Sequence, residues 1–260
     1  MLDLIAQPLL LFLLCLVRPL AAFRTAPLLG ATVMPPQTLN SFGIALCLLI
    51  YPVAAVGAPQ QIPLSWLLLP LVVKELFIGL IIGFFLGILF WTAQSLGLLI
   101  DNQRGASMAQ GADPLAGDQM SPFGSFFFQF AAMLFFASGA FTSFLGMIME
   151  SYAIWPVLAP LPSLTGSGMQ NLLLLQADMV LRMAVLLAAP ILALCFLTDF
   201  GLGLINRFAQ QLNVFVLSMP LKSLVALFVL SVYAGAMLGM FGQGIRDMDL
   251  VFGKLREALR

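Results

Sequence analysis

Long apolar blocks, separated by short polar or proline-rich stretches, make up most of this 260-residue sequence. A helix that crosses a membrane needs about 20 apolar residues, so the pattern predicts a series of membrane helices. The blocks cover residues 4–17, 42–56, 64–100, 123–149, 172–198 and 214–241. The first two are short for a span, whereas the third would be about 55 Å long. A split at Lys74-Glu75 would leave its first piece too short to span, so we expect helices of unequal length.

Composition places the chain among integral membrane proteins. Apolar residues make up 62% of it and charged residues 8%, and the mean hydropathy is +1.07. In soluble domains about a quarter of the residues are charged. The formal net charge is zero, which gives no overall field for binding nucleic acid. We therefore predict an all-α membrane protein built from helical hairpins of unequal length.

The residue types that most often carry catalysis are absent or isolated. The chain has no histidine, which removes Ser-His and Cys-His pairs and the commonest metal ligand. Cys15, Cys47 and Cys195 lie singly in apolar segments without C-x-x-C spacing, and we expect them to pack as small core residues. Asp247 and Asp249 lie beside a basic tail and are expected to form a solvated helix face. We predict no enzyme activity, no cofactor and no metal site.

A polar, glycine-rich loop at residues 101–124 interrupts the apolar pattern. It carries four charged residues, Asp101, Arg104, Asp113 and Asp118. Irregular backbone at membrane depth is tolerated only where it is buried in protein or lines a water-filled passage, because its N–H and C=O groups have no partner in lipid. The loop is therefore the first candidate for a functional segment.

Charged residues within the apolar blocks need partners, because a charge at the centre of a membrane helix costs about 2.5 to 3.5 kcal/mol. Asp178 and Arg182 are four residues apart with the acid first, which favours an ion pair between them. Lys74 and Glu75 are adjacent, about 100° apart around a helix, so we expect them to have different counter-charges or to lie at a helix break near water. Other chains would supply such counter-charges, and so would a water-filled transport cavity.

Ser218 and Pro220 resemble an N-cap and a first-turn proline, and they predict a helix that begins at about Met219. Lys222 would then lie in the first turn, where the helix dipole disfavours a positive charge. We expect an acid from outside this helix to balance it.

Gly79, Gly83 and Gly87 recur every four residues and place three positions without side chains on one helix stripe. Such a stripe predicts the close approach of another helix. Gly235 and Gly239 repeat the pattern once. The spacing leaves open whether the neighbouring helix belongs to the same chain.

The last residues, 242–260, are expected to form an amphipathic tail after a helical domain of residues 1–241. Apolar residues at positions 245, 248, 252, 255 and 259 recur at intervals of three and four, as in a helix with one apolar face. Such a helix would lie on the membrane or on its own protein, or would dock a partner. Its basic residues favour a cytoplasmic C-terminus: Arg246, Lys254, Arg256 and Arg260.

Several runs of residues then point to a family. They are Lys74-Glu75-Leu-Phe-Ile-Gly79, Phe84-Phe-Leu-Gly87, Trp91 with Gln94-Ser95, Ile100-Asp-Asn-Gln-Arg-Gly-Ala-Ser-Met108, Ala112-Asp-Pro114 and Asn213-Val-Phe-Val-Leu-Ser-Met-Pro-Leu-Lys222. Over essentially its whole length the chain resembles the SctT/FliR family of export-apparatus proteins from bacterial type III secretion and flagellar systems. The run after Ile100 is more similar to the injectisome branch, which serves virulence, than to the flagellar branch.

The resemblance implies a non-enzymatic subunit of a protein-export gate in the bacterial inner membrane. It also implies partners: gate subunits of the SctR/FliP and SctS/FliQ types, a SctU/FlhB-type switch protein, a SctV/FlhA-type export protein, membrane lipid and unfolded secreted substrates. In this family the gate subunits form a helical, cone-shaped assembly that rises above the bilayer plane. The residues expected to serve its assembly or packing are Lys74, Glu75, Gly79, Gly83, Gly87, Asp178, Arg182, Pro220 and Lys222.

In this family the loop equivalent to residues 101–124 projects into the channel and helps to plug it. Flagellar members tend to have phenylalanine where this chain has Met108, and a methionine would also make a deformable apolar seal. Arg104, paired with an acid of the loop, would hold the closed form. The expected plug residues are Asp101, Arg104, Met108, Asp113, Pro114, Asp118 and Met120.

The alternative function is an autonomous secondary transporter or channel. Such a protein would form a stable complex without partners and would show ligand-dependent uptake after reconstitution. An internal sequence repeat would favour it, and we find none.

Overall fold

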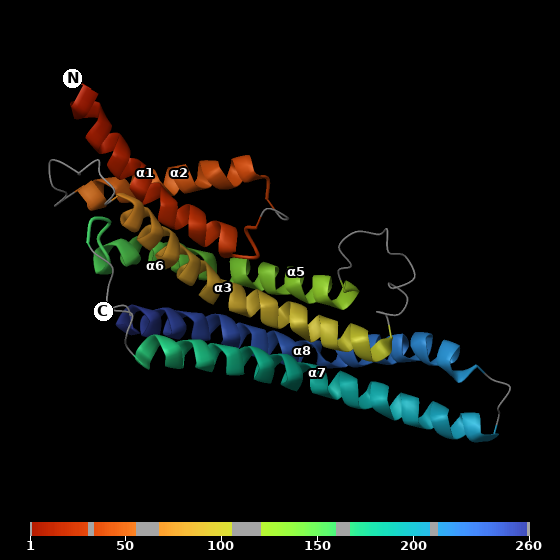
Figure 1. Cartoon of the computed structure of the whole chain (residues 1–260). Helices are drawn as coiled ribbons and strands as arrows, with labels where there is room; N and C mark the ends of the chain where they lie inside the picture. The colour runs from red at the N-terminus through yellow and green to blue at the C-terminus, as the bar shows by residue number, and fades with distance from the viewer. Residues whose placement is uncertain are drawn as a thin grey trace. The chain divides into compact units, whose positions relative to one another are not determined.

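A computed structural model describes residues 2–30, 34–55, 68–105, 121–159, 167–208 and 213–258. Within these ranges the regular structure is helical, with no strand, which confirms the all-α prediction (Figure 1). The helices are α1 (Leu2–Thr25), α2 (Pro36–Ala55), α3 (Leu68–Arg104), α5 (Pro122–Ala137), α6 (Ala140–Ile154), α7 (Ser167–Phe208) and α8 (Val214–Ala258).

Four helices of the described residues are long and apolar enough to cross a membrane, or five if α5 and α6 together form one span. The four stretches are Gln7–Thr25, Leu68–Arg104, Leu174–Phe208 and Val216–Asp247. Their lengths are unequal, as predicted. Of the two alternatives for Lys74 and Glu75, the helix break is absent, because α3 runs through both residues without interruption. Their counter-charges lie inside the protein.

The chain divides into two compact units, and the segments of the two units alternate along the sequence. Unit 1 contains Met1–Ile88, Gly139–Leu174 and Arg246–Arg260. Unit 2 contains Leu89–Ser138 and Leu175–Ile245. The helices α3, α7 and α8 therefore each contribute residues to both units.

In unit 1, α3 packs closely on α1 through the predicted glycine stripe. A Cβ atom added at Gly79 would lie 2.6 Å from the Cβ of Ala21, and one added at Gly83 would lie 2.8 Å from the Cβ of Thr25. Neither position has room for a side chain. The neighbouring helix of this part of the stripe thus belongs to the same chain. Gly87, the third member, is buried.

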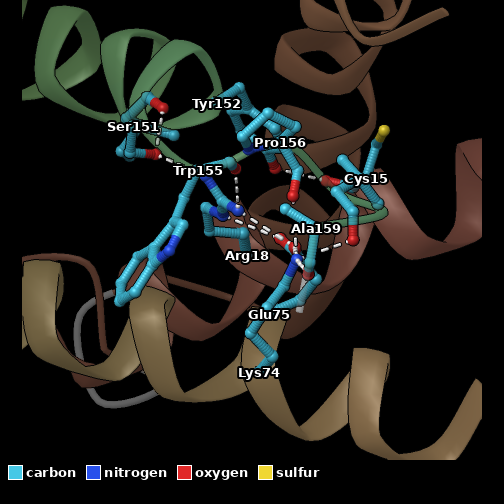
Figure 2. Close-up of polar contacts among 11 residues, drawn as sticks. Cys15, Arg18, Lys74, Glu75, Ser151, Tyr152, Trp155, Pro156 and Ala159 are labelled. Carbon is cyan, nitrogen blue, oxygen red and sulfur yellow. Dashed lines mark hydrogen bonds and ion pairs between the residues drawn. The ribbon is translucent and has the colours of Figure 1, made fainter. Parts of the chain in front are cut away.

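A buried ionic cluster joins α1, α3 and α6 within unit 1 (Figure 2). The Arg18 guanidinium donates two hydrogen bonds to the Glu75 carboxylate, at 2.7 and 2.9 Å, and both side chains are fully buried. Arg18 also donates to the Ser151 hydroxyl and to the Trp155 carbonyl, each at 2.9 Å. Its guanidinium lies 4.0 Å from the centre of the Tyr152 ring. This bidentate, charge-assisted pairing is the geometry that best offsets the desolvation cost of burying the charges.

Lys74 completes the cluster on the other side of Glu75. Its ammonium donates to the backbone carbonyls of Pro156, Val157 and Ala159, at 2.9, 2.6 and 3.0 Å. It also lies 3.1 Å from a Glu75 carboxylate oxygen. The lysine therefore fixes the turn that follows α6, and its charge is satisfied within this chain.

The expectation of different counter-charges is therefore wrong for Lys74, which pairs with Glu75 itself. Their backbone positions do point about 100° apart around the helix. The lysine side chain is long enough to bend back, and the Glu75 carboxylate lies where it faces both cations. One acid thus balances Arg18 and Lys74 together.

In unit 2, the second part of α3 packs on α5. Gly97 lies directly against the backbone of Phe123 and Gly124 and leaves no room for a side chain. Nearby, the Phe90 ring lies 5.6 Å from the Phe128 ring and 5.5 Å from the Phe135 ring, measured between centroids. This packing holds the end of α3 beside the start of α5.

The start of α8 differs from the prediction. The helix begins at Val214, not at about Met219, and Pro220 lies inside it. The Asn213 side-chain oxygen accepts a hydrogen bond from the Val216 N–H at 3.4 Å, so Asn213 caps the helix earlier. Lys222 is consequently beyond the first turn, where the helix dipole no longer opposes its charge.

Replacement of the shared acid tests the ionic cluster. In Glu75→Gln two cations remain buried without an anion, so we expect the free energy of unfolding to fall by about 3 to 5 kcal/mol. Thermal unfolding of the detergent-solubilised protein measures the loss. Asp247→Asn, which neutralises an exposed acid, is the control and should melt as the wild type does. Equal melting temperatures for Glu75→Gln and the control would contradict the role of the cluster.

Candidate functional site

The site is built around the two ends of the predicted plug loop, both of which belong to unit 2. The helix α3 ends at Arg104, and Gly105 follows with φ +83°, a left-handed conformation that favours glycine. The helix α5 begins at Pro122 after the N-cap residue Ser121. Residues 106–120 between these ends, with Met108, Asp113, Pro114, Asp118 and Met120, lie outside the described residues.

Asp101 joins the two ends of the loop. Its side chain lies in the last turn of α3 and is almost fully buried. One carboxylate oxygen accepts hydrogen bonds from the Ser121 hydroxyl and from the Phe123 N–H, the latter at 2.9 Å. Ser121 in turn accepts from the Gly124 N–H at 2.9 Å. A single carboxylate thus ties the end of α3 to the first turn of α5, where a negative charge is favourable.

Arg104 neutralises Asp101 from the same helix. Its Nε atom lies 2.5 Å from the second carboxylate oxygen of Asp101. The guanidinium lies 4.7 Å from the centre of the Phe123 ring and donates to the Ser223 hydroxyl of α8 at 3.4 Å. Arg104 was expected to pair with an acid of the loop, and the acid it contacts is Asp101, at the base of the loop.

Lys222 of α8 supports the same end of α3. Its ammonium donates to the Gln103 carbonyl at 2.9 Å and to the Asp199 carboxylate of α7 at 3.1 Å. A positive charge at the C-terminus of a helix is favourable, and the Asp199 carboxylate balances it. The acid expected from outside the helix of Lys222 is thus Asp199. We call the contacts of Asp101, Ser121, Arg104, Lys222 and Asp199 the loop clamp.

The loop clamp is suited to holding backbone in place. Its charged groups are engaged with one another, with helix ends and with hydroxyl groups. In the described part of the chain, no group of three or more His, Cys, Asp or Glu side chains is arranged to hold a metal ion. What the arrangement does physically is fix the separation and direction of the two chain segments that enter and leave residues 106–120.

The predicted pair of Asp178 and Arg182 does not form. Both side chains are exposed on α7, and the ion pairs of the described residues include no contact between them. A spacing of four residues brings two side chains to one face of a helix. An ion pair at that spacing contributes only about 0.2 to 0.5 kcal/mol to helix stability, which does not fix the side-chain rotamers. Among the described residues, a Cβ added at Gly235 or Gly239 would meet no atom within 4 Å, so no described helix packs closely on that stripe.

Among the residues that sequence reasoning missed are Arg18 of the ionic cluster and Ser121 and Asp199 of the loop clamp. Ser121 followed by Pro122 carries the sequence signature of an N-cap and a first-turn proline, so it was detectable. Arg18 lies one residue beyond the end of the first apolar block, so it does not count among the charges within the blocks. Asp199 likewise follows an apolar block by one residue, and its lysine lies 23 residues further along the chain.

The sequence is similar to those of known bacterial export proteins. The family model described as "Bacterial export proteins, family 1" matches residues 9–248. The Yop proteins translocation protein T of Yersinia pestis is 40% identical over 237 residues, 91% of this chain and 90% of that protein. The surface presentation of antigens protein SpaR of Salmonella typhimurium is 32% identical over 212 residues, 81% of this chain and 78% of that protein. The flagellar biosynthetic protein FliR of Bacillus subtilis is 29% identical over 221 residues, 85% of each chain.

The matched region extends from α1 into α8 and includes both the ionic cluster and the loop clamp. Identity to the Yersinia and Salmonella proteins exceeds identity to the flagellar protein. The chain belongs to the SctT/FliR family of bacterial export proteins and is of the injectisome type.

Proposed function

We propose that this chain is a non-enzymatic subunit of the export gate of a type III secretion system, and that residues 101–124 contribute a plug to the channel. Family membership makes it an inner-membrane component of bacterial export machinery. Its proposed cargo is unfolded secreted protein. The proposed seal consists of the apolar side chains of Met108 and Met120, with Asp113, Pro114 and Asp118 shaping the loop.

The loop clamp is the observation that carries the proposal. A connection that only joined two neighbouring helices would need few residues, because most connections between secondary-structure elements are short. Here Asp101 holds Ser121 across a separation of 20 residues, so the chain between them leaves and returns at one place. A long segment held at its base supports a role as a projecting element within a passage.

The length of α7 supports a role inside a larger assembly. Its 42 residues extend over about 63 Å at about 1.5 Å per residue, about twice the hydrocarbon thickness of a bilayer. Large apolar side chains are exposed from Leu174 to Phe208. A bilayer is too thin to contact the whole length of this helix, so we propose that other protein chains contact the rest. The proposed chains are gate subunits of the SctR/FliP and SctS/FliQ types, with SctU/FlhB-type and SctV/FlhA-type proteins around them.

We further propose a cytoplasmic C-terminus, with residues 242–260 acting as an amphipathic tail to the export-gate domain of residues 1–241. The helix α8 continues through residue 242 to Ala258, and most side chains of the tail lie outside the described residues. In our proposal five residues of α3 serve packing inside this chain and leave its outer faces for contacts with other subunits. They are Lys74, Glu75, Gly79, Gly83 and Gly87.

Shortening the loop tests the plug. Deletion of residues 106–111 keeps Gly105 and the loop clamp, so the subunit should still assemble. We expect leakage of ions or small molecules through the assembled gate to rise several-fold, because the segment can no longer fill the passage. Leakage is measured in cells that express the whole apparatus, and assembly by co-purification of its subunits.

A matched control separates chain length from side-chain chemistry. Replacement of residues 106–111 by six glycine and serine residues keeps the length but removes Met108. If Met108 forms part of the seal, this variant should also leak. Wild-type leakage from a correctly assembled deletion complex would contradict the plug.

The loop clamp is tested by exchanging its outer charges. In Lys222→Asp with Asp199→Lys the ion pair persists, but an acid faces the Gln103 carbonyl and destabilises the end of α3. We expect raised leakage from this exchange and from Lys222→Gln, since a hydrogen bond from a charged donor is worth about 1.5 to 3 kcal/mol. Asp199→Asn should have the smaller effect, because Lys222 keeps its carbonyl partner. Full recovery of the barrier by the exchange would show that only the ion pair matters.

A further inference from the structure

The outer face of one part of α7 combines two charged side chains with large apolar ones. Asp178 and Arg182 are exposed, and Leu175, Leu181 and Val185 are 56%, 67% and 52% exposed. With about 100° of rotation per residue, these five positions lie on one side of the helix. We call these five residues the Asp178 face.

The inner side of the same helix is already used. Ala184, Leu187, Ala188 and Ile191 are each at most 3% exposed, and they lie on the side of α7 that packs within unit 2. In the described part of the chain, neither charge of the Asp178 face makes an ion pair. The face therefore presents two unpaired charges and three large apolar side chains outward.

Neither water nor lipid hydrocarbon is a suitable cover for this face. In hydrocarbon the two charges would be costly to leave without partners. In water the three apolar side chains would form an unfavourable exposed patch. A water–lipid boundary at the charges does not solve this, because Leu175 precedes them along the helix and Val185 follows them. A protein surface that is apolar and also carries charges satisfies both demands.

A second copy of this chain does not fit through the same face. Two copies in one membrane have the same orientation, and a face can contact the same face of another copy only about a two-fold axis. That axis would run along the membrane normal, so the two α7 helices would be parallel. Asp178 would then lie level with Asp178 of the other copy, and Arg182 with Arg182, which places like charges together.

We propose that the Asp178 face docks a membrane helix of a different subunit, one that is apolar and carries a basic side chain opposite Asp178 and an acidic side chain opposite Arg182. The two charges of that helix would be about 6 Å apart along the axis, the rise of four residues. Complementary charges within an apolar contact fix register and exclude wrong partners. The proposal rests on the proposed function, because it requires the chain to work inside a multi-subunit assembly.

Photo-crosslinking in the full apparatus tests the proposal. A photoreactive amino acid replaces Leu181 in the full-length chain, which is expressed with the other subunits, and the adducts formed in membranes are identified. We expect an adduct with one subunit of another kind. The exchange Asp178→Arg with Arg182→Asp should lower the yield of that adduct about tenfold or more, because it sets like charges against each other.

A matched exchange serves as the control. Arg246→Asp with Asp247→Arg also swaps two exposed charges of opposite sign on a long helix and keeps the net charge, so the adduct yield at position 181 should stay as in the wild type. An equal loss in both exchanges would overturn the proposal. The identity of the adduct in the otherwise wild-type chain does not depend on how well either exchange variant folds.

Three further outcomes would overturn the proposal: adducts with lipid only, adducts with a second copy of this chain, or an unchanged yield after the Asp178 and Arg182 exchange. Failure of the proposed function is recognised separately, because the purified wild-type chain would then carry no other subunit of the apparatus. If subunits co-purify but position 181 reaches only lipid, the docking proposal alone is wrong.

Discussion

The structure depends on one constraint: a charge placed among apolar helices must have a partner. Glu75 balances Arg18 and Lys74 at once, and the spare hydrogen-bond donors of those two cations are taken up by a hydroxyl group and backbone carbonyls. Removal of one member of such a buried set costs far more than the set contributes as a whole. The cluster therefore connects α1, α3 and α6 through side chains that are each costly to remove.

The same constraint shapes the base of the loop in unit 2. Asp101 is buried, and it connects the last turn of α3 to the first turn of α5. Lys222 reaches the end of α3 from α8 and is balanced by Asp199 of α7. Four helices thus meet at the place where residues 106–120 begin and end. These contacts fix both ends of that segment to the helices of unit 2.

Much of the architecture was predictable from the sequence, because composition and block length follow directly from the requirements of a bilayer. The helix stripe of Gly79 and Gly83 and the pairing of Arg104 with Asp101 were also predictable, since both depend on local spacing. The remaining contacts were not. The pairing of Arg18 with Glu75 spans 57 residues, and no spacing rule connects such positions.

Two predictions failed for a shared reason, since both used backbone geometry to decide what side chains do. Lys74 and Glu75 diverge at the backbone yet meet through a long side chain. Asp178 and Arg182 converge at the backbone yet remain unpaired. Helical spacing sets which residues share a face, while burial and the neighbouring elements decide whether their charges meet.

The central claim is that the clamped loop lies in the path of the exported protein. Crosslinking from Met108→Cys to a cysteine in a substrate stalled during export tests it most directly, with Val232→Cys, a highly exposed position on α8, for comparison. The account predicts a disulfide to the stalled substrate from position 108 and none from position 232. A substrate that is exported and stalled normally but never reacts with position 108 would contradict it.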